Sequence, residues 1–156
     1  MTPGRVRSAG LLLHRRGAHG DEVWIGHMGG PFWAKKEERA WSIPKGELEP
    51  GEDELAGALR EFAEELGTPA PDADYERLGE FRYASGKVVV VFVAETPGFD
   101  PGEFDGGAFR MEWPPRSGRT IEVPELDRGG WVPVERAREL LVAGQVSALD
   151  ALSARR

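Results

Sequence analysis

The sequence contains no cysteine, which excludes cysteine nucleophiles, zinc–thiolate sites and disulfides. It also has no long apolar run: Ala9–Leu13 and Val88–Ala94 are both far too short to span a bilayer, so we expect no contact with a membrane. No basic stretch leads into a long apolar segment near the first residue, so we expect no signal peptide and a cytoplasmic protein. His14, His19 and His27 show no metal-ligand spacing, and we expect them at the surface or at strand ends.

Basic residues are scarce. Lysine and arginine number 20 against 27 acidic residues, which gives a net charge of −7. Binding to polymeric nucleic acid depends on a basic surface, so we expect no such partner, whereas a small polyanion neutralised by metal ions stays compatible with this charge. Two further chemistries lack their motifs: Ser85-Gly86-Lys87 has no upstream glycine at the spacing of a phosphate-binding loop, and no G-x-S-x-G is present.

The composition is otherwise that of a globular protein. Hydrophobic residues make up 40% and charged residues 30% of a chain of 156 residues, a length that suits one domain over residues 1–156. The 21 glycines and 12 prolines predict long or numerous loops around a modest set of helices and strands.

The hydrophobic pattern predicts strands, then a helix, then strands, then short helices, which favours an α/β or α+β sandwich with a mixed sheet. Helix Asp53–Leu66 has an apolar stripe, an N-capping aspartate and a C-terminal glycine at Gly67. The segment around Ser85-Gly86 reads as a hairpin whose second strand, Val88–Ala94, is apolar on both faces and therefore central. The other expected elements are strands at Val6–His14, Glu22–Met28, Trp41–Ile43, Ala108–Trp113 and Trp131–Val134, an exposed loop at Gly29–Ala40, a turn at Pro114–Arg119, and helices at Glu135–Val142 and Val146–Leu152.

Glutamates crowd one side of the expected helix. Glu61, Glu64 and Glu65 are spaced i, i+3 and i+4, so their carboxylates are neighbours, and each like-charge pair costs about 0.2–0.5 kcal/mol. Arg60 is the only nearby cation on the helix. One interpretation is a solvated helix face. The other is a site for Mg²⁺ or Mn²⁺, which prefer oxygen ligands and would reverse the sign of this repulsion.

The loop before the helix favours the second interpretation. Gly46 and Gly51 allow a backbone carbonyl or a phosphate to come close to the carboxylates. The pattern Gly46, five residues, Glu52, seven residues and then Arg60–Gly67 resembles the Nudix box of the Nudix hydrolases, and the box spans Gly46–Thr68. Thr68 departs from the aliphatic residue that is usual at its position, which is a packing position.

Weaker similarity extends from Ala9–Leu13 through Trp41–Glu52 to Pro124–Leu140. The resemblance implies the Nudix α/β/α sandwich with a mixed β-sheet, in which the box forms a loop–helix–loop. It also implies hydrolysis of a diphosphate linkage in a nucleotide by attack of water on phosphorus, with Mg²⁺ or Mn²⁺ as cofactor. Nudix domains often dimerise, so a homodimer is compatible with the resemblance.

Roles of individual residues follow from the same resemblance. Glu61, Glu64 and Glu65 are similar to the metal-ligating glutamates, with the carbonyl of Gly46 as a backbone ligand. Either Glu64 or Glu65 would also orient or deprotonate the attacking water. Arg60 resembles the arginine that holds the glutamates by ion pairing, and Glu52 resembles the first glutamate of the box, a supporting residue. A Nudix-fold module that binds a nucleotide without hydrolysing it is the alternative, although such modules typically lose these glutamates.

Substrate recognition is less well defined by the sequence. The stretch Trp41–Gly46 is similar to Nudix enzymes that act on nucleoside triphosphates, including oxidised ones, and on dinucleoside polyphosphates such as diadenosine tetraphosphate. Several side chains are candidates to contact a nucleotide, each with an ordinary structural role as its alternative. Lys45 and Lys87 would contact phosphate or be solvated, Phe32 and Trp33 with Lys35 would stack a base or cap the core, and Glu125 and Asp127 would supply an extra metal ligand or catalytic base or lie on a solvated loop.

Overall fold

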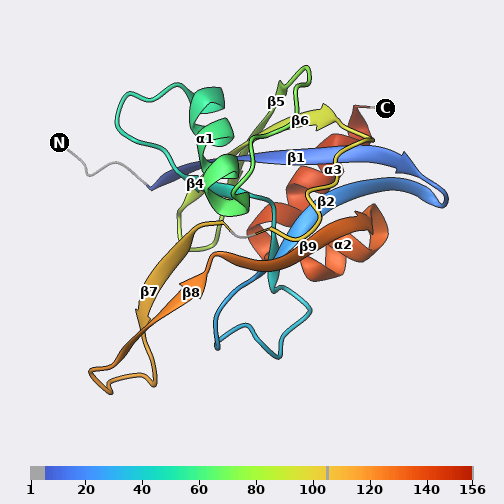
Figure 1. The fold of residues 1–156 in the computed structure, drawn as a ribbon. Coiled ribbons are helices and arrows are strands. Elements are labelled where there is room, and N and C mark those ends of the chain that lie inside the picture. The colour runs from blue at the N-terminus through green and yellow to red at the C-terminus, as the bar shows by residue number, and fades with distance from the viewer. Residues whose placement is uncertain (1–5, 105, 156) are drawn as a thin grey trace.

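The computed structural model describes residues 6–104 and 106–155. Figure 1 shows its helices and strands along the chain. The strands are β1 (Arg7–Gly17), β2 (Gly20–Met28), β3 (Trp41–Ser42), β4 (Lys45–Glu47), β5 (Glu76–Arg82), β6 (Val88–Glu95), β7 (Ala108–Glu112), β8 (Thr120–Pro124) and β9 (Leu126–Pro133). The helices are α1 (Glu54–Leu66), α2 (Val134–Leu140), the 3₁₀ turn η1 (Ala143–Gln145) and α3 (Val146–Ala154).

The main sheet is mixed and is built around β1. Strand β1 pairs in parallel with β6 and antiparallel with β2, which gives the order β3-β2-β1-β6-β5, while β4 pairs with β1 and β9 with β2. Strand β6 is buried along its length up to Glu95, as its apolar sequence predicted. Strands β7 and β8 pair only with each other, and in Figure 1 this hairpin projects from the body of the protein.

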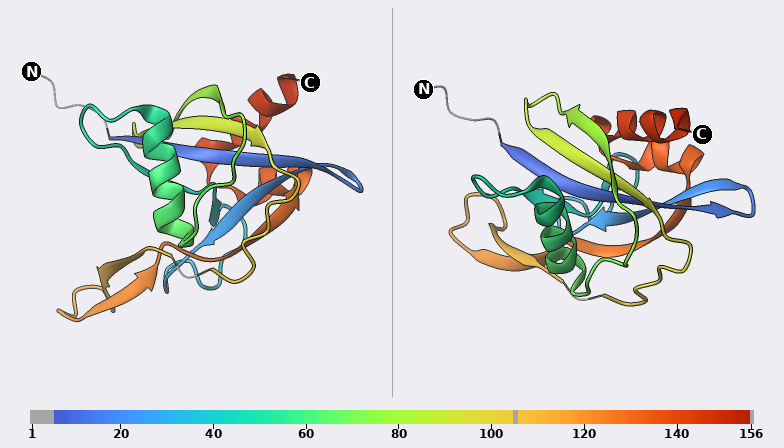
Figure 2. Two further views of the ribbon diagram at one scale, coloured as in Figure 1. Left: turned by 45° about the horizontal axis from the view of Figure 1, so that its top comes forward. Right: turned by 90° about the horizontal axis from the view of Figure 1, so that it is seen from above.

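Helices cover both faces of the sheet, and Figure 2 shows α1 on one side and α2 with α3 on the other. Alternate residues of β1 serve the two layers: Leu11 and Leu13 pack in the cluster of α1, whereas Leu12 packs in the cluster of α2 and α3. The expected α/β/α sandwich is therefore confirmed. Among the described residues, no helix is long and apolar enough to cross a membrane.

Helix α1 forms where its periodicity predicts. The side chain of Asp53 accepts a hydrogen bond from the amide of Ala56 at 2.9 Å, and Gly67 ends the helix in the left-handed conformation with φ of 67°. Ala58, Phe62 and Leu66 are buried against the sheet. Glu61 and Glu65, beside this stripe, lie against β4, whereas Glu64 is more exposed.

The C-terminal third differs from the sequence-based prediction. Strand β8 was not expected, and β9 begins at Leu126, whereas the sequence predicted a strand only from Trp131. The predicted loop around Asp127 was therefore wrong. Gly129 and Gly130 are poor strand residues, but β9 is held in the sheet by antiparallel pairing with β2, which a local pattern does not reveal. Trp41 belongs to the core, and Trp131 is partly buried and packs against the cluster of α1.

Candidate active site

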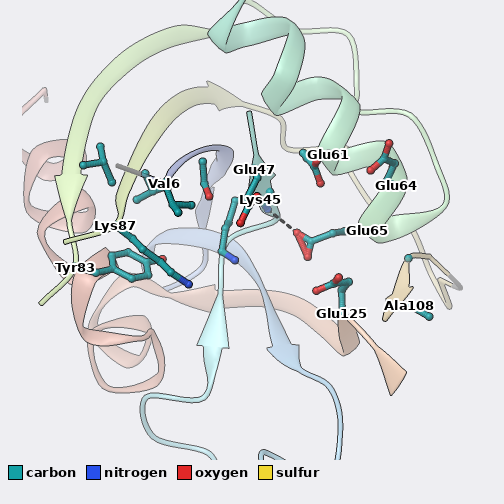
Figure 3. Close-up of a pocket in the computed structure, with 15 residues that line it drawn as sticks. Val6, Lys45, Glu47, Glu61, Glu64, Glu65, Tyr83, Lys87, Ala108 and Glu125 are labelled. Atoms are coloured by element: carbon teal, nitrogen blue, oxygen red, sulfur yellow. Dashed lines mark hydrogen bonds between the residues drawn. The ribbon is translucent and has the colours of Figure 1, made fainter. Parts of the chain in front are cut away.

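The glutamates of α1 open onto a cavity of about 410 Å³. Its walls come from α1, strand β4, the β5–β6 hairpin and the junction between β8 and β9 (Figure 3). Figure 3 shows Glu61, Glu64, Glu65 and Glu125 along one wall, Tyr83 and Lys87 along the opposite wall, and Lys45 with Glu47 between them. The lining includes Lys45, Gly46, Glu61, Glu64, Glu65, Tyr83, Lys87 and Glu125.

Glu65 is the most deeply placed of these acids, with 7% of the residue exposed. The backbone amide of Lys45 donates a 2.7 Å hydrogen bond to its Oε1. The pKa of Glu65 is raised to about 8, mainly by burial; the charge and amide of Lys45 act against this rise, and the charges of Glu125 and Glu61 add to it. A metal-free site therefore disfavours the ionised form of this side chain.

Glu61 shares this environment. Its side chain is 16% exposed, and burial is the main cause that raises its pKa, although the 2.7 Å hydrogen bond from Arg60 acts against the rise. Gly46 lies directly against the Glu61 carboxylate, because a Cβ built on Gly46 would overlap Oε2 of Glu61. Glycine at this position lets the β4 backbone and the carboxylate share one small space. Glu64 is the most exposed of the three, at 58% of its side chain.

Arg60 bonds to several of the acidic side chains at once. Its guanidinium donates two hydrogen bonds to Glu52, of 2.8 and 2.9 Å, one to Glu61, one of 3.3 Å to Glu64 and one to the carbonyl of Glu47. The paired bonds from Arg60 and a further one from the amide of Glu49 lower the pKa of Glu52 to about 2. Glu52 therefore stays ionised and fixes Arg60 over the other carboxylates.

The donor set fits a hard divalent cation. All the charged donors are carboxylates, and the nearby backbone of Gly46 adds a carbonyl, which is the chemistry that Mg²⁺ and Mn²⁺ prefer. The raised pKa values of Glu61 and Glu65 show that ionisation is unfavourable without a positive charge nearby. Within residues 6–104 and 106–155, no three histidine, aspartate or glutamate side chains converge closely enough to hold a metal. A bound cation would therefore need the carboxylates to come closer together than they are here.

The cavity is also lined by Lys45 and Lys87, both candidates from the sequence, and by Tyr83, which the sequence analysis missed. Figure 3 shows Tyr83 and Lys87 across the cavity from the carboxylates of α1, with Lys45 between them. The hydroxyl of Tyr83 accepts a 2.7 Å hydrogen bond from Nε2 of the buried Gln145, which fixes the ring. The predicted hairpin could have pointed to Tyr83, because Tyr83 lies opposite the candidate Lys87 across the turn. The amide of Tyr83 donates to the Lys87 carbonyl at 2.8 Å.

The structure separates Glu125 from Asp127. Glu125 stands between β8 and β9 and lines the cavity, whereas Asp127 lies 2.9 Å from Nδ1 of His27 through its Oδ1. The side chain of His27 is fully buried, and its Nε2 donates to the carbonyl of Lys36 at 2.7 Å. His27 therefore lies at the end of β2, as one of the two expectations had it, but it is not at the surface, because two hydrogen bonds satisfy its ring inside the protein.

The loop that carries Phe32, Trp33 and Lys35 lies apart from the residues that line the cavity. Phe32 is 52% exposed and stacks under the ammonium of Lys36 at 3.7 Å, whereas Trp33 packs against the core. Lys35 is exposed. Among the described residues that line the cavity, none comes from this loop.

Comparisons with known proteins agree with this geometry. The family model of the NUDIX domain matches residues 4–152. No curated protein matches the sequence. The Caenorhabditis elegans Ap4A hydrolase, in a binary complex, is a similar structure, with 25% identity, 96% of each chain covered and a TM-score of 0.62.

Two further structures share the fold at lower identity. The NUDIX domain of Shewanella oneidensis NrtR, complexed with ADP ribose, is 15% identical over 99% of this chain and 90% of its own, with a TM-score of 0.64. A MutT protein from Methanosarcina mazei is 17% identical over 99% and 97%, with a TM-score of 0.59. With a family model that matches nearly the whole chain and a cavity lined by the glutamates of the box, this protein belongs to the Nudix family.

Proposed function

We propose that this protein is a Mg²⁺-dependent pyrophosphohydrolase that cleaves a phosphoanhydride of a nucleotide by attack of water on phosphorus. The observation that carries the proposal is the division of one cavity into a carboxylate wall and a lysine wall. A diphosphate with bound cations matches both walls, since its metal-bound side meets carboxylates and its free oxygens meet ammonium groups.

Glu61, Glu64, Glu65 and the carbonyl of Gly46 are the groups that would hold Mg²⁺ or Mn²⁺. A bound cation supplies charge neutralisation and a water of lowered pKa. Lys45 and Lys87 orient the diphosphate from the other side. Because one oxygen of Glu65 already accepts the Lys45 amide, we assign proton removal from the attacking water to the more exposed Glu64.

Similarity to the C. elegans Ap4A hydrolase favours a dinucleoside polyphosphate as substrate. Nucleoside triphosphates, oxidised or not, present the same diphosphate to the same walls and are the second class to test. The net charge of −7 gives no support to a polymeric nucleic acid as partner. A homodimer and a cytoplasmic location stay predictions from the sequence.

A non-hydrolysing nucleotide-binding module is the competing function. It needs the fold and a nucleotide pocket but no proton acceptor. The arrangement of Glu61, Glu64 and Glu65 around one cavity, with Arg60 bonded to the first two, favours the enzyme, because a binding module has no need for a repulsive cluster of partly buried acids.

The test is a turnover assay with Mg²⁺ over a panel of Ap4A, nucleoside triphosphates and 8-oxo-nucleoside triphosphates, with products resolved by chromatography. We expect Glu64→Gln to lower kcat by about 100-fold or more on the substrate that the wild type prefers, since general bases contribute about 10²–10⁴-fold. Glu38→Gln is the matched control: it removes the same charge from an exposed residue outside the cavity. Nucleotide binding without turnover of any member, with either Mg²⁺ or Mn²⁺, would establish the competing function instead.

A further inference from the structure

A pair of glycines lies against the last turn of α1. Gly106 packs flat on the peptide that joins Glu65 to Leu66, and a Cβ built there would overlap the carbonyl carbon and oxygen of Glu65. These are backbone atoms of a buried helix end, so they have no rotamer with which to move aside. Any side chain at position 106 therefore requires a shift of the 106–107 segment relative to α1.

The same segment bridges α1 and the junction that carries Glu125. The amide of Gly107 donates to the carbonyl of Glu64, and the amide of Glu125 donates to the carbonyl of Gly107 at 2.9 Å. The carbonyl of Glu125 in turn accepts the amide of Gly29 at 3.1 Å. Three consecutive backbone hydrogen bonds thus run from the turn of the helix glutamates to Glu125 and on to the end of β2.

Glu125 stands close enough to act with the helix glutamates. It lines the same cavity as Glu61, Glu64 and Glu65, and its charge contributes to the raised pKa of both Glu61 and Glu65. A Cβ on Gly107 would lie 3.6 Å from Cγ of Glu125 and 3.1 Å from the carbonyl oxygen of Glu64. The backbone of Gly107 therefore bonds both to the last turn of α1 and to Glu125.

We propose that Gly106 and Gly107 are positioning residues, which form a backbone strut that sets the place of the Glu125 carboxylate relative to the carboxylates of α1. This inference rests on the proposed function, because the strut matters to catalysis only if these carboxylates hold the cation and the attacking water. A shift of about 1 Å in a reacting group can lower a rate by about 10²-fold. The closeness of the packing at Gly106 makes a shift of that order the expected result of adding one methyl group.

Three alanine variants form a graded series. Gly106→Ala meets backbone atoms, Gly107→Ala is tight at 3.1 Å, and Gly98→Ala, upstream in the same connecting segment, meets nothing within 4 Å. We expect kcat to fall about 100-fold for Gly106→Ala, less for Gly107→Ala and not at all for Gly98→Ala, with KM changed less than twofold. Amide hydrogen exchange, measured without metal or substrate, should show loss of protection at Glu125 and Gly107 in the first two variants only.

A double-mutant cycle with Glu125→Gln separates positioning from general damage to the fold. If the strut acts through Glu125, Glu125→Gln lowers kcat by itself, and Gly106→Ala in that background causes little further loss. Three results would overturn the inference. The first is that the losses in kcat of Gly106→Ala and Glu125→Gln multiply in the double variant. The others are an unchanged kcat in Glu125→Gln, or full kcat in both glycine variants. If the thermal midpoint shows that Gly106→Ala does not fold, Gly107→Ala takes its place in the double-mutant cycle with Glu125→Gln. Absence of wild-type turnover would instead refute the proposed function, and the exchange experiment would still test the strut.

Discussion

Replacing Glu65 with glutamine is expected to stabilise the metal-free protein at high pH while it weakens the metal site. The side chain is buried, and glutamine has the same shape and can keep the hydrogen bond from the Lys45 amide through its own carbonyl oxygen. The change therefore removes the ionisable group and little else.

The magnitude follows from the pKa of Glu65, which is about 8 in the folded protein against an ordinary value of 4.5. Between these two values the folded state binds a proton that the unfolded state has released, so the free energy of unfolding falls as pH rises. Each unit of pH costs about 1.4 kcal/mol, so the full penalty above pH 8 has an upper limit of about 5 kcal/mol. Side-chain relaxation and water entry reduce it, and we expect Glu65→Gln to gain about 2 kcal/mol or more at pH 9.

Urea unfolding in EDTA at pH 5 and pH 9 measures this difference. The two proteins should be about equally stable at pH 5, where folded Glu65 is protonated, and should diverge at pH 9. Added Mg²⁺ should stabilise the wild type at pH 9 and have little effect on the variant, because binding to the folded state alone raises stability by mass action. Equal stability of the two proteins at pH 9, or a variant less stable than the wild type there, would refute this account of the buried carboxylate.

Two other substitutions test how the carboxylates are held. Gly46→Ala places a methyl group on the Glu61 carboxylate, so we expect kcat to fall about 100-fold while the thermal midpoint changes little, and an active Gly46→Ala enzyme would contradict the close packing. Arg60→Gln leaves Glu52 without its paired hydrogen bonds and the helix acids unscreened, which should lower the unfolding free energy. In urea unfolding, the double variant Arg60→Gln with Glu52→Gln should lose less unfolding free energy than the sum of the two single variants. Strict additivity would argue against an interaction between Arg60 and Glu52.

Local patterns predicted the parts of the site that lie within one segment. Periodicity placed Phe62 and Leu66 in the core, and the spacing of Glu61 and Glu64 brought their carboxylates to one side of α1. Gly46 was singled out for close approach, and the structure shows the neighbour that requires it.

The remaining parts depend on contacts between distant segments. Glu125 reaches the cavity because β9 pairs with β2, and Tyr83 reaches it because β6 pairs with one edge of β1 while β4 pairs with the other. His27 carries no local sign of burial, since its partners are Asp127, a hundred positions away, and a carbonyl in the following loop. Pairing of this kind is decided by the whole sheet, which no single stretch of sequence encodes.

The β7–β8 hairpin has a consequence for how such a protein can be altered. Its strands bond only to each other, so shortening it to a tight turn would remove no hydrogen bond of the seven-stranded sheet. Its root nevertheless borders the cavity, at Ala108. The hairpin can therefore be shortened or replaced to change which molecules enter the cavity. The carboxylates on α1 would keep their hydrogen bonds to Arg60 and to the Lys45 amide.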